Sequence, residues 1–273
     1  MSASPSAKDV PVTTRDFIAW KAAGRKIVVV TAYDALFGRL VDEAGVDCVL
    51  VGDSVNQVLA GEPSTLSATL DQMIYHARAV RRGVKQALVV VDLPFLSYQV
   101  SREEAVRNAG RVMKETGAQA VKLEGGATMA GTVGALVEIG IPVMGHIGLT
   151  PQSVHALGGY RVQGREEESA RRLESDAAAL ESAGVFSIVL ELVPAALAGK
   201  ITTARGVPTI GIGAGAACDG QVLVLHDLLG LNDGFAPKFL KRYASLAGDV
   251  RDAVSRFGDE VRAGVYPDAD HSF

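Results

Sequence analysis

Short apolar runs alternate with amphipathic segments along most of the chain, and this alternation restricts the possible folds more than any other feature. Runs rich in Val, Ile and Leu are typical of parallel strands that are buried on both faces. The segments between them have helical spacing, and most end in a glycine of the kind that terminates helices. Eight apolar runs occur, at residues 27–31, 48–52, 88–92, 119–124, 142–147, 186–191, 207–212 and 221–227.

This order predicts an α/β fold, and specifically a (β/α)8 TIM barrel in which strands and helices alternate. A doubly wound open sheet is the alternative. It is less well supported, because the count of runs reaches eight and no G-x-G-x-x-G motif follows an early strand. We therefore expect a single barrel domain over residues 13–273.

The two ends of the chain carry further expectations. A short helix precedes the first strand, with Thr13 or Thr14 as its N-cap and Gly24 at its end. Residues 1–12 are small and polar, so we expect a disordered N-terminal tail there. The stretch 236–264 has helical spacing and is expected to supply the last helices of the barrel.

Composition excludes several classes of protein. The chain is 48% hydrophobic but 5% aromatic, so its apolar side chains are mainly aliphatic, as in buried parallel strands. Its 27 basic and 31 acidic residues are mixed without a basic stripe, which argues against a nucleic-acid partner. Two cysteines without paired spacing, and no apolar run of membrane-spanning length, lead us to expect a soluble protein of the cytoplasm.

Charged residues at the ends of predicted strands are the main functional signal. In a barrel of this kind the chemistry lies at the C-terminal ends of the strands. Lys122 and Glu124 are two residues apart, so they share one face of their strand. Six such residues occur, on five strands: Asp53, Asp92, Lys122, Glu124, His146 and Glu191.

Each of these residues taken alone has a structural explanation. Asp53 suits an Asx turn or a helix cap, Lys122 with Glu124 suits a structural ion pair, and a single histidine is more often structural than catalytic. These explanations weaken together, because all six residues converge on one rim of one barrel. The set therefore favours a candidate active site.

Carboxylates that gather at one rim repel one another unless a cation neutralises them. Oxygen ligands without paired cysteines favour Mg²⁺ over zinc. A 2-oxo acid would chelate the ion through its carboxylate and keto oxygens, and the ion would act as a Lewis acid that stabilises an enolate. Lys122 would then neutralise the substrate carboxylate, and Glu191 would remain free to take a proton from carbon.

Motifs along the chain from about Thr13 onward resemble the ketopantoate hydroxymethyltransferase family in order and spacing. They are TAYDA (31–35), LVGDS (50–54), DLPF (92–95), VKLEGG (121–126), GHIGLTPQS (145–153), GGYRVQGR (158–165), LELVP (190–194), GIGAG (211–215) and the terminal HSF.

The resemblance implies a barrel of the phosphoenolpyruvate/pyruvate-binding type and a cytoplasmic homodecamer. It implies one Mg²⁺ per subunit, held by Asp53, Asp92 and Glu124, and Glu191 as general base. The 2-oxo acid would be bound by Asp53, Ser54, Asp92, Lys122 and His146.

The implied reaction belongs to pantothenate biosynthesis. A one-carbon hydroxymethyl unit passes from 5,10-methylenetetrahydrofolate to 3-methyl-2-oxobutanoate, which gives 2-dehydropantoate and tetrahydrofolate. No residue pattern in the sequence indicates by itself where a folate would bind.

Three alternatives stay open at the level of the sequence. The first is a Mg²⁺-dependent lyase or mutase that acts on another 2-oxo acid or a phosphonate with the same acids. The second is an aldolase that forms a Schiff base at Lys122, which borohydride trapping would detect. The third is a metabolite-binding protein without catalysis, in which Glu191→Gln would change nothing.

Overall fold

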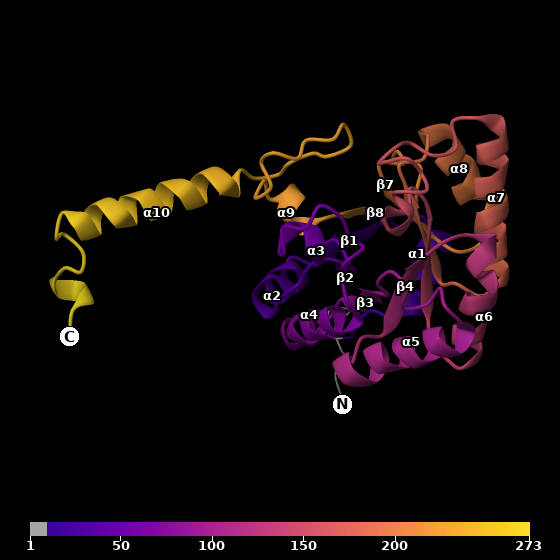
Figure 1. The fold of residues 1–273 in the computed structure, drawn as a ribbon, viewed down its shortest axis with the longest axis horizontal. Helices are drawn as coiled ribbons and strands as arrows, with labels where there is room; N and C mark the ends of the chain where they lie inside the picture. The colour runs from indigo at the N-terminus through magenta and orange to yellow at the C-terminus, as the bar shows by residue number, and fades with distance from the viewer. Residues whose placement is uncertain (1–9) are drawn as a thin grey trace, which may run out of the picture. The chain divides into compact units, whose positions relative to one another are not determined.

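A computed structural model describes residues 10–273 of the chain. The chain divides into two compact units, Met1–Val224 and Leu225–Phe273. The first unit contains a closed barrel of eight parallel strands that pair in chain order, with helices around it (Figure 1). The strands are β1 (Ile27–Thr31), β2 (Cys48–Val51), β3 (Leu88–Asp92), β4 (Ala120–Glu124), β5 (Val143–Gly148), β6 (Ser187–Glu191), β7 (Thr209–Ile212) and β8 (Gly220–Leu223). The predicted (β/α)8 fold is confirmed.

Helices follow each of the strands β1 to β6, as the amphipathic segments predict. The predicted helix over 126–140 consists of a 3₁₀ turn, η1 (Ala127–Met129), and then a regular helix. A short helix after β2 and a 3₁₀ turn after β5 were not predicted. The elements around the strands are α2 (Ala35–Glu43), α3 (Val55–Val58), α4 (Leu70–Gly83), α5 (Arg102–Thr116), α6 (Ala130–Glu138), η2 (Pro151–Ser153), α7 (Glu167–Ser182) and α8 (Ala195–Ala204).

The predicted strand over 221–227 is partly wrong. Strand β8 ends at Leu223, and residues Leu225–Leu228 form a helical turn, α9. A short apolar run has no periodicity that separates a strand from a buried helical turn, so the boundary could not be placed from the pattern.

Helix α1 (Thr14–Ala22) precedes the barrel, as predicted. Its N-cap is Thr13, whose backbone N–H donates to Oδ2 of Asp16 at 2.7 Å. Gly24 follows the helix with a φ of +68°, in the left-handed region. Phe17 is fully buried and meets Phe186 edge to face, with 5.4 Å between ring centroids. Because Phe186 directly precedes β6, this contact places α1 at the N-terminal end of the barrel.

The predicted disordered tail over 1–12 falls mostly outside the described residues, which begin at Val10. Within them, the backbone N–H of Val12 donates to the carbonyl oxygen of Gln86 at 2.7 Å, so this residue is tied to the chain segment before β3.

The second unit contains α9, a longer helix α10 (Leu246–Arg262) and a final 3₁₀ turn η3 (Ala269–His271). Helix α10 begins ten residues later than the predicted helical stretch 236–264. A single domain over 13–273, with this stretch as the last barrel helices, stays a prediction. Across residues 10–273, we find no helix with the length and hydropathy that crossing a membrane requires.

The barrel interior has an apolar layer and, nearer the C-terminal ends of the strands, a polar layer. Side chains alternate along a strand, so a residue two positions further on points the same way. Four residues of the polar layer each follow a residue of the apolar layer by two positions. The pairs are Val90 and Asp92, Ala120 and Lys122, Met144 and His146, and Val189 and Glu191. The apolar layer consists of Ile27, Val29, Cys48, Leu50, Leu88, Val90, Ala120, Met144, Val189, Ile210 and Val222.

Candidate active site

The pairing of the strands brings the predicted residues into one polar cluster at the C-terminal end of the barrel. Asp92 on β3 is paired in register with Lys122 on β4. Glu124, further along β4, is paired with His146 on β5. Asp53 joins them from the end of β2, where its backbone N–H donates to Oδ2 of Asp92 at 3.1 Å. The backbone alone therefore accounts for most of this arrangement.

Lys122 forms a buried ion pair with Asp92. Its Nζ lies 2.9 Å from Oδ1 of Asp92, and both side chains are almost fully buried. Burial alone would lower the pKa of the Lys122 ammonium, but the charges of Asp92, Glu124 and Asp53 together raise it above its usual value. Lys122 is therefore a fixed positive charge at neutral pH.

Asp53 and Glu124 are acids whose charged forms are disfavoured. Burial, and then the charge of Asp92, raises the pKa of Asp53 to about 7. Burial, and then the charge of Asp53, raises the pKa of Glu124 well above its usual range. Lys122 opposes both shifts without cancelling them. The cluster has more negative charge than its one lysine balances, so a cation would bind favourably here.

His146 and Glu191 meet on the neighbouring strands β5 and β6. Oε2 of Glu191 lies 3.2 Å from Nε2 of His146. Burial raises the pKa of Glu191 to about 7, against the effect of Lys122. Burial, and then the charge of Lys122, lowers the pKa of His146 well below its usual range, so the imidazole is neutral. Glu191 is also more exposed than His146, with 17% of its side chain accessible against 4%, so it faces the opening.

Lys122 determines which nitrogen of His146 carries the proton. Its Nζ lies 3.3 Å from Nδ1 of His146, and an ammonium can donate but not accept. Nδ1 therefore accepts, and the proton of the neutral ring stands on Nε2, the atom that faces Glu191. This assignment follows from the hydrogen-bond network.

Ser54 lies beside the acids at the start of α3. Its Oγ is 2.8 Å from the hydroxyl of Tyr33, a fully buried residue after β1. A Cβ at Gly52 would stand 2.8 Å from Oγ of Ser54 and 3.6 Å from Oδ2 of Asp92, so glycine leaves room for both side chains. Tyr33 was not predicted as a site residue, although it belongs to the TAYDA motif.

Gln152 and Tyr98 also belong to the cluster and were missed. Gln152, in η2, donates from Nε2 to Oδ2 of Asp53 and from its backbone N–H to Oε2 of Glu124, each at 2.9 Å. The hydroxyl of Tyr98 lies 2.7 Å from Oε1 of Gln152. Both residues are neutral and stand in loops, so strand periodicity could not indicate them. Gln152 does fall within the quoted motif GHIGLTPQS.

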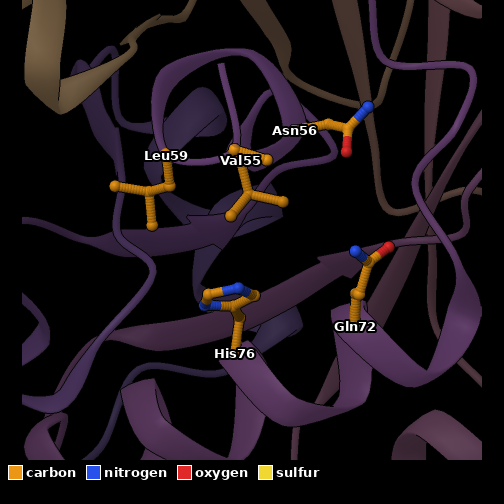
Figure 2. Close-up of a pocket in the computed structure, with 6 residues that line it drawn as sticks. Val55, Asn56, Leu59, Gln72 and His76 are labelled. Atoms are coloured by element: carbon orange, nitrogen blue, oxygen red, sulfur yellow. The ribbon is translucent and has the colours of Figure 1, made fainter. Parts of the chain in front are cut away.

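A small cavity of about 230 Å³ lies between α3 and α4 (Figure 2). In Figure 2, His76 and Gln72 extend from α4 towards the segment that holds Val55 and Asn56 of α3 and Leu59 directly after it. Nδ1 of His76 is 2.7 Å from the carbonyl oxygen of Tyr33. The cavity wall is thus connected to the residue that contacts Ser54, but none of the predicted acids lines it.

The backbone is strained directly after Glu191. Leu192 has a φ of +47°, which a branched residue rarely adopts. Two hydrogen bonds hold it there: its N–H donates to the carbonyl oxygen of Ile212 at 2.9 Å, and its carbonyl accepts from N–H of Gln163 at 2.8 Å. This turn fixes the end of β6 and with it the position of Glu191.

The donor set fits a hard divalent cation. No three of the His, Cys, Asp and Glu side chains in residues 10–273 form a preformed metal cage. Mg²⁺ does not need one, because it commonly takes one or two carboxylates and completes its shell with water and substrate oxygens. Oδ1 of Asp92 and Nε2 of His146 are buried without a well-aligned hydrogen bond in the described structure. The residues that could hold the ion are Asp53, Asp92 and Glu124.

Comparison with known proteins agrees with the resemblance seen in the motifs. A family model described as ketopantoate hydroxymethyltransferase matches residues 11–269. The 3-methyl-2-oxobutanoate hydroxymethyltransferase of Pelobacter propionicus is 58% identical over 262 residues, which cover 96% of this chain and 97% of that protein.

Two solved structures show the same fold at low identity. A 2,3-dimethylmalate lyase of the PEP mutase/isocitrate lyase superfamily has a TM-score of 0.59 at 16% identity, covering 95% of this chain and 91% of that one. A phosphonopyruvate hydrolase in complex with oxalate and Mg²⁺ has a TM-score of 0.59 at 13% identity, covering 95% and 93%. These likenesses show that the chain shares the (β/α)8 barrel fold of these proteins. From its match to the family over nearly its whole length, the chain belongs to the ketopantoate hydroxymethyltransferase family of enzymes.

Proposed function

We propose that the chain transfers the one-carbon unit of 5,10-methylenetetrahydrofolate to 3-methyl-2-oxobutanoate, in the pathway to pantothenate. The products are 2-dehydropantoate and tetrahydrofolate. The observation that carries this proposal is the position of Glu191, a carboxylate with a pKa of about 7 beside the neutral His146 and next to the acid cluster. A base of this kind suits removal of a proton from carbon next to a polarised ketone.

Asp53, Asp92 and Glu124 would hold a single Mg²⁺ ion. When bound, Mg²⁺ supplies Lewis-acid polarisation of the keto oxygen and neutralises negative charge. The phosphonopyruvate hydrolase with oxalate and Mg²⁺ supports this choice, because oxalate has the adjacent oxygens of a 2-oxo acid and the barrel is of the same type.

Other residues would bind and orient the substrate. Lys122 supplies a permanent positive charge near the substrate carboxylate and the oxygen that gains negative charge. Ser54 offers its hydroxyl to the substrate carboxylate, and Tyr33 holds that hydroxyl in place. Both act before any bond breaks, since they orient the 2-oxo acid so that its C3 faces the opening of the barrel.

Glu191 then takes the proton from C3. The electron pair of the broken C–H bond first forms the enolate and then the new bond to the one-carbon unit. The one-carbon unit loses both of its bonds to the folate nitrogens, and the oxygen of a water molecule becomes the hydroxyl group of the product. The two nitrogens take up one proton from that water and the proton that Glu191 removed, which gives tetrahydrofolate and restores the base. Nε2–H of His146 lies 3.2 Å from Oε2 of Glu191 without being aligned as a hydrogen bond, and this proximity is what would keep the carboxylate directed at C3.

A Schiff-base mechanism at Lys122 is disfavoured by the geometry. A protonated ammonium cannot attack a carbonyl, and the ion pair with Asp92 keeps Lys122 protonated. A lyase or mutase acting on another 2-oxo acid would use the same acids, so it is separated from the proposal by its substrate and not by its residues.

Deuterium exchange at C3 of 3-methyl-2-oxobutanoate in D₂O tests the proposal. We expect exchange that requires Mg²⁺ and proceeds without folate, and formation of 2-dehydropantoate after 5,10-methylenetetrahydrofolate is added. Exchange that survives a chelator would contradict the role of the metal. Exchange without any product on addition of the folate would favour the lyase or mutase alternative.

We also propose that the chain acts in the cytoplasm as a homodecamer. Support comes from the family resemblance, and exposed apolar side chains on α2, such as Leu36 and Leu40, are compatible with subunit contacts. Sedimentation of the purified protein tests the assembly: a mass well below ten subunits at micromolar concentration would contradict it.

A further inference from the structure

The side-chain amide of Gln152 is buried with every hydrogen-bonding position satisfied. Its Nε2 donates to Oδ2 of Asp53 at 2.9 Å and to the carbonyl oxygen of Leu93 at 3.0 Å. Its Oε1 accepts from the hydroxyl of Tyr98 at 2.7 Å and from Nε2 of Gln99 at 3.1 Å. A complete set of this kind in a buried side chain indicates a fixed orientation.

The neighbours of Gln152 allow one orientation of its amide. A backbone carbonyl accepts but cannot donate, so the group that faces Leu93 must be the NH₂. The hydroxyl of Tyr98 accepts from the N–H of Glu124 at 3.1 Å, and its single hydrogen has two acceptors within reach. Oε1 of Gln152 at 2.7 Å is closer than the carbonyl oxygen of Glu124 at 3.2 Å, so the shorter bond goes to the glutamine. Tyr98 and Leu93, both in the loop after β3, thus direct the amide nitrogen towards Asp53.

Gln152 contacts two of the three acids at once. Its side chain takes one oxygen of Asp53, and its backbone N–H donates to Oε2 of Glu124 at 2.9 Å. The second oxygen of each carboxylate is not bonded to Gln152. These oxygens are Oδ1 of Asp53 and Oε1 of Glu124, and the latter lies 3.6 Å from Nδ1 of His146. One residue therefore restricts the rotation of both carboxylates, of which Asp53 follows β2 and Glu124 ends β4.

We propose that Gln152 is a positioning residue that determines which oxygen Asp53 and Glu124 present to the divalent cation. The inference rests on the Mg²⁺ site of the proposed function. Tyr98 acts on Asp53 through Gln152, because its hydroxyl orients the amide, and it also contacts the backbone N–H and carbonyl of Glu124 directly. Holding the two acids in place before the ion arrives lowers the ordering cost of binding it.

The chemistry of glutamine suits this position better than that of its near isosteres. Glutamate would put a further carboxylate against Oδ2 of Asp53 and the carbonyl of Leu93, where it would repel both. Methionine has a similar length but gives Asp53 no donor and accepts only weakly from Tyr98. Gln152→Met thus removes the proposed function of the side chain with little change in volume.

The test measures Mg²⁺ binding to the full-length protein without substrate, by calorimetry, and the spectrum of bound Mn²⁺ by electron paramagnetic resonance. We expect Gln152→Met to weaken Mg²⁺ binding at least tenfold, and Tyr98→Phe to weaken it about threefold or more. The double variant should lose less affinity than the product of the two single losses, because Tyr98 and Gln152 share one hydrogen bond. The Mn²⁺ spectrum should change in the same variants.

Two controls keep the interpretation specific. Gln221→Met alters a glutamine on β8 whose Nε2 donates to the carbonyl of Gly215, and it should bind Mg²⁺ like the parent. Asp92→Asn tests the proposed function itself. If the parent fails to bind Mg²⁺, or Asp92→Asn binds it as well as the parent, the metal site is wrong and not merely the role of Gln152.

The inference is overturned if the parent binds Mg²⁺, Asp92→Asn weakens it, and a folded Gln152→Met binds within twofold of the parent. Should Gln152→Met not fold, Tyr98→Phe decides, since it keeps the glutamine and loses one hydroxyl. Parental affinity together with a parental Mn²⁺ spectrum in Tyr98→Phe would then contradict the inference.

Discussion

Nε2 of His146 lies 3.2 Å from Oε2 of Glu191, across the boundary between β5 and β6. The imidazole is neutral because burial and Lys122 lower its pKa, so its contact with the carboxylate carries no full ionic attraction. A charged histidine here would make Glu191 a weaker base. The neutral ring therefore leaves the basicity of Glu191 intact.

The first prediction concerns His146. We expect His146→Leu to slow C3 exchange by about 10- to 100-fold, because Glu191 loses the group that orients it but keeps its own reactivity. Mg²⁺ affinity should change little, since His146 is not a proposed ligand. Exchange rates from proton NMR, together with calorimetry, check both parts, and an unchanged exchange rate would refute the orienting role.

The second prediction concerns the base itself. Glu191→Gln should reduce C3 exchange by about 10²- to 10⁴-fold, the usual contribution of a general base, while Mg²⁺ and the 2-oxo acid still bind. Glu138→Gln, which alters an exposed acid on α6, is the matched control and should exchange like the parent. Loss of substrate binding in Glu191→Gln would assign this residue to binding instead.

The third prediction is the pH dependence of exchange. Burial raises the pKa of Glu191 to about 7, and the protonated acid cannot take a proton from carbon. The rate should therefore fall about tenfold for each pH unit below about 7 and level off above it. Rates at saturating Mg²⁺ between about pH 5.5 and 8.5 provide the measurement, and a flat profile would contradict the assignment.

The fourth prediction links stability to the metal. The pKa values of Asp53 and Glu191 are each raised to about 7, above the value of about 4 in an unfolded chain. The folded state therefore binds these protons more tightly, and the free energy of unfolding should fall as pH rises from about 4 through about 7. Mg²⁺ should reverse the loss at pH 8, raising Tm by about 5 °C at a hundredfold excess over Kd.

Thermal melts with EDTA or Mg²⁺ at about pH 5.5 and pH 8 check this expectation. The gain from Mg²⁺ should be larger at the higher pH, where the acids are ionised. An equal gain at both values would show that the ion does not neutralise these carboxylates. Asp71→Asn, at an exposed acid paired with Arg111, should leave the pattern unchanged.

The fifth prediction concerns Tyr33. Removing its hydroxyl in Tyr33→Phe releases Oγ of Ser54, which lies 2.8 Å away in the parent. We expect KM for 3-methyl-2-oxobutanoate to rise about three- to tenfold with kcat within twofold, since binding is weakened and the base is untouched. Steady-state kinetics measure the two constants, and a fall in kcat alone would place Tyr33 in the chemical step.

The barrel and its charged residues could be predicted because they follow regular spacings. Eight apolar runs indicate the strands, and period two places Lys122 and Glu124 on one face. The strand-end acids then meet because parallel strands end on the same rim. The prediction was weakest where periodicity gives no information, as at the end of β8 and in the turn α9.

The neutral residues of the site could not be predicted in this way. Gln152 is 99 residues from Asp53 along the chain, and Tyr98 is 54 residues from Gln152. Their contacts depend on the path of two loops, which neither composition nor spacing specifies. A charged residue at the end of an apolar run can be identified from the sequence, whereas a buried amide or phenol of the site is identified only from its hydrogen bonds in the structure.

The register of the strands has a consequence for how such an enzyme can evolve. Asp92 faces Lys122, Glu124 faces His146, and Gly148 faces Glu191, each pair as direct neighbours in the sheet. Inserting or deleting one residue inside one of these strands would exchange its inward and outward side chains and separate the pairs in which that strand takes part. The loops that follow the strands can change in length without this shift of side chains. Descendants of this chain can therefore acquire new acceptors by exchanging loops, while the frame of the strands is inherited intact.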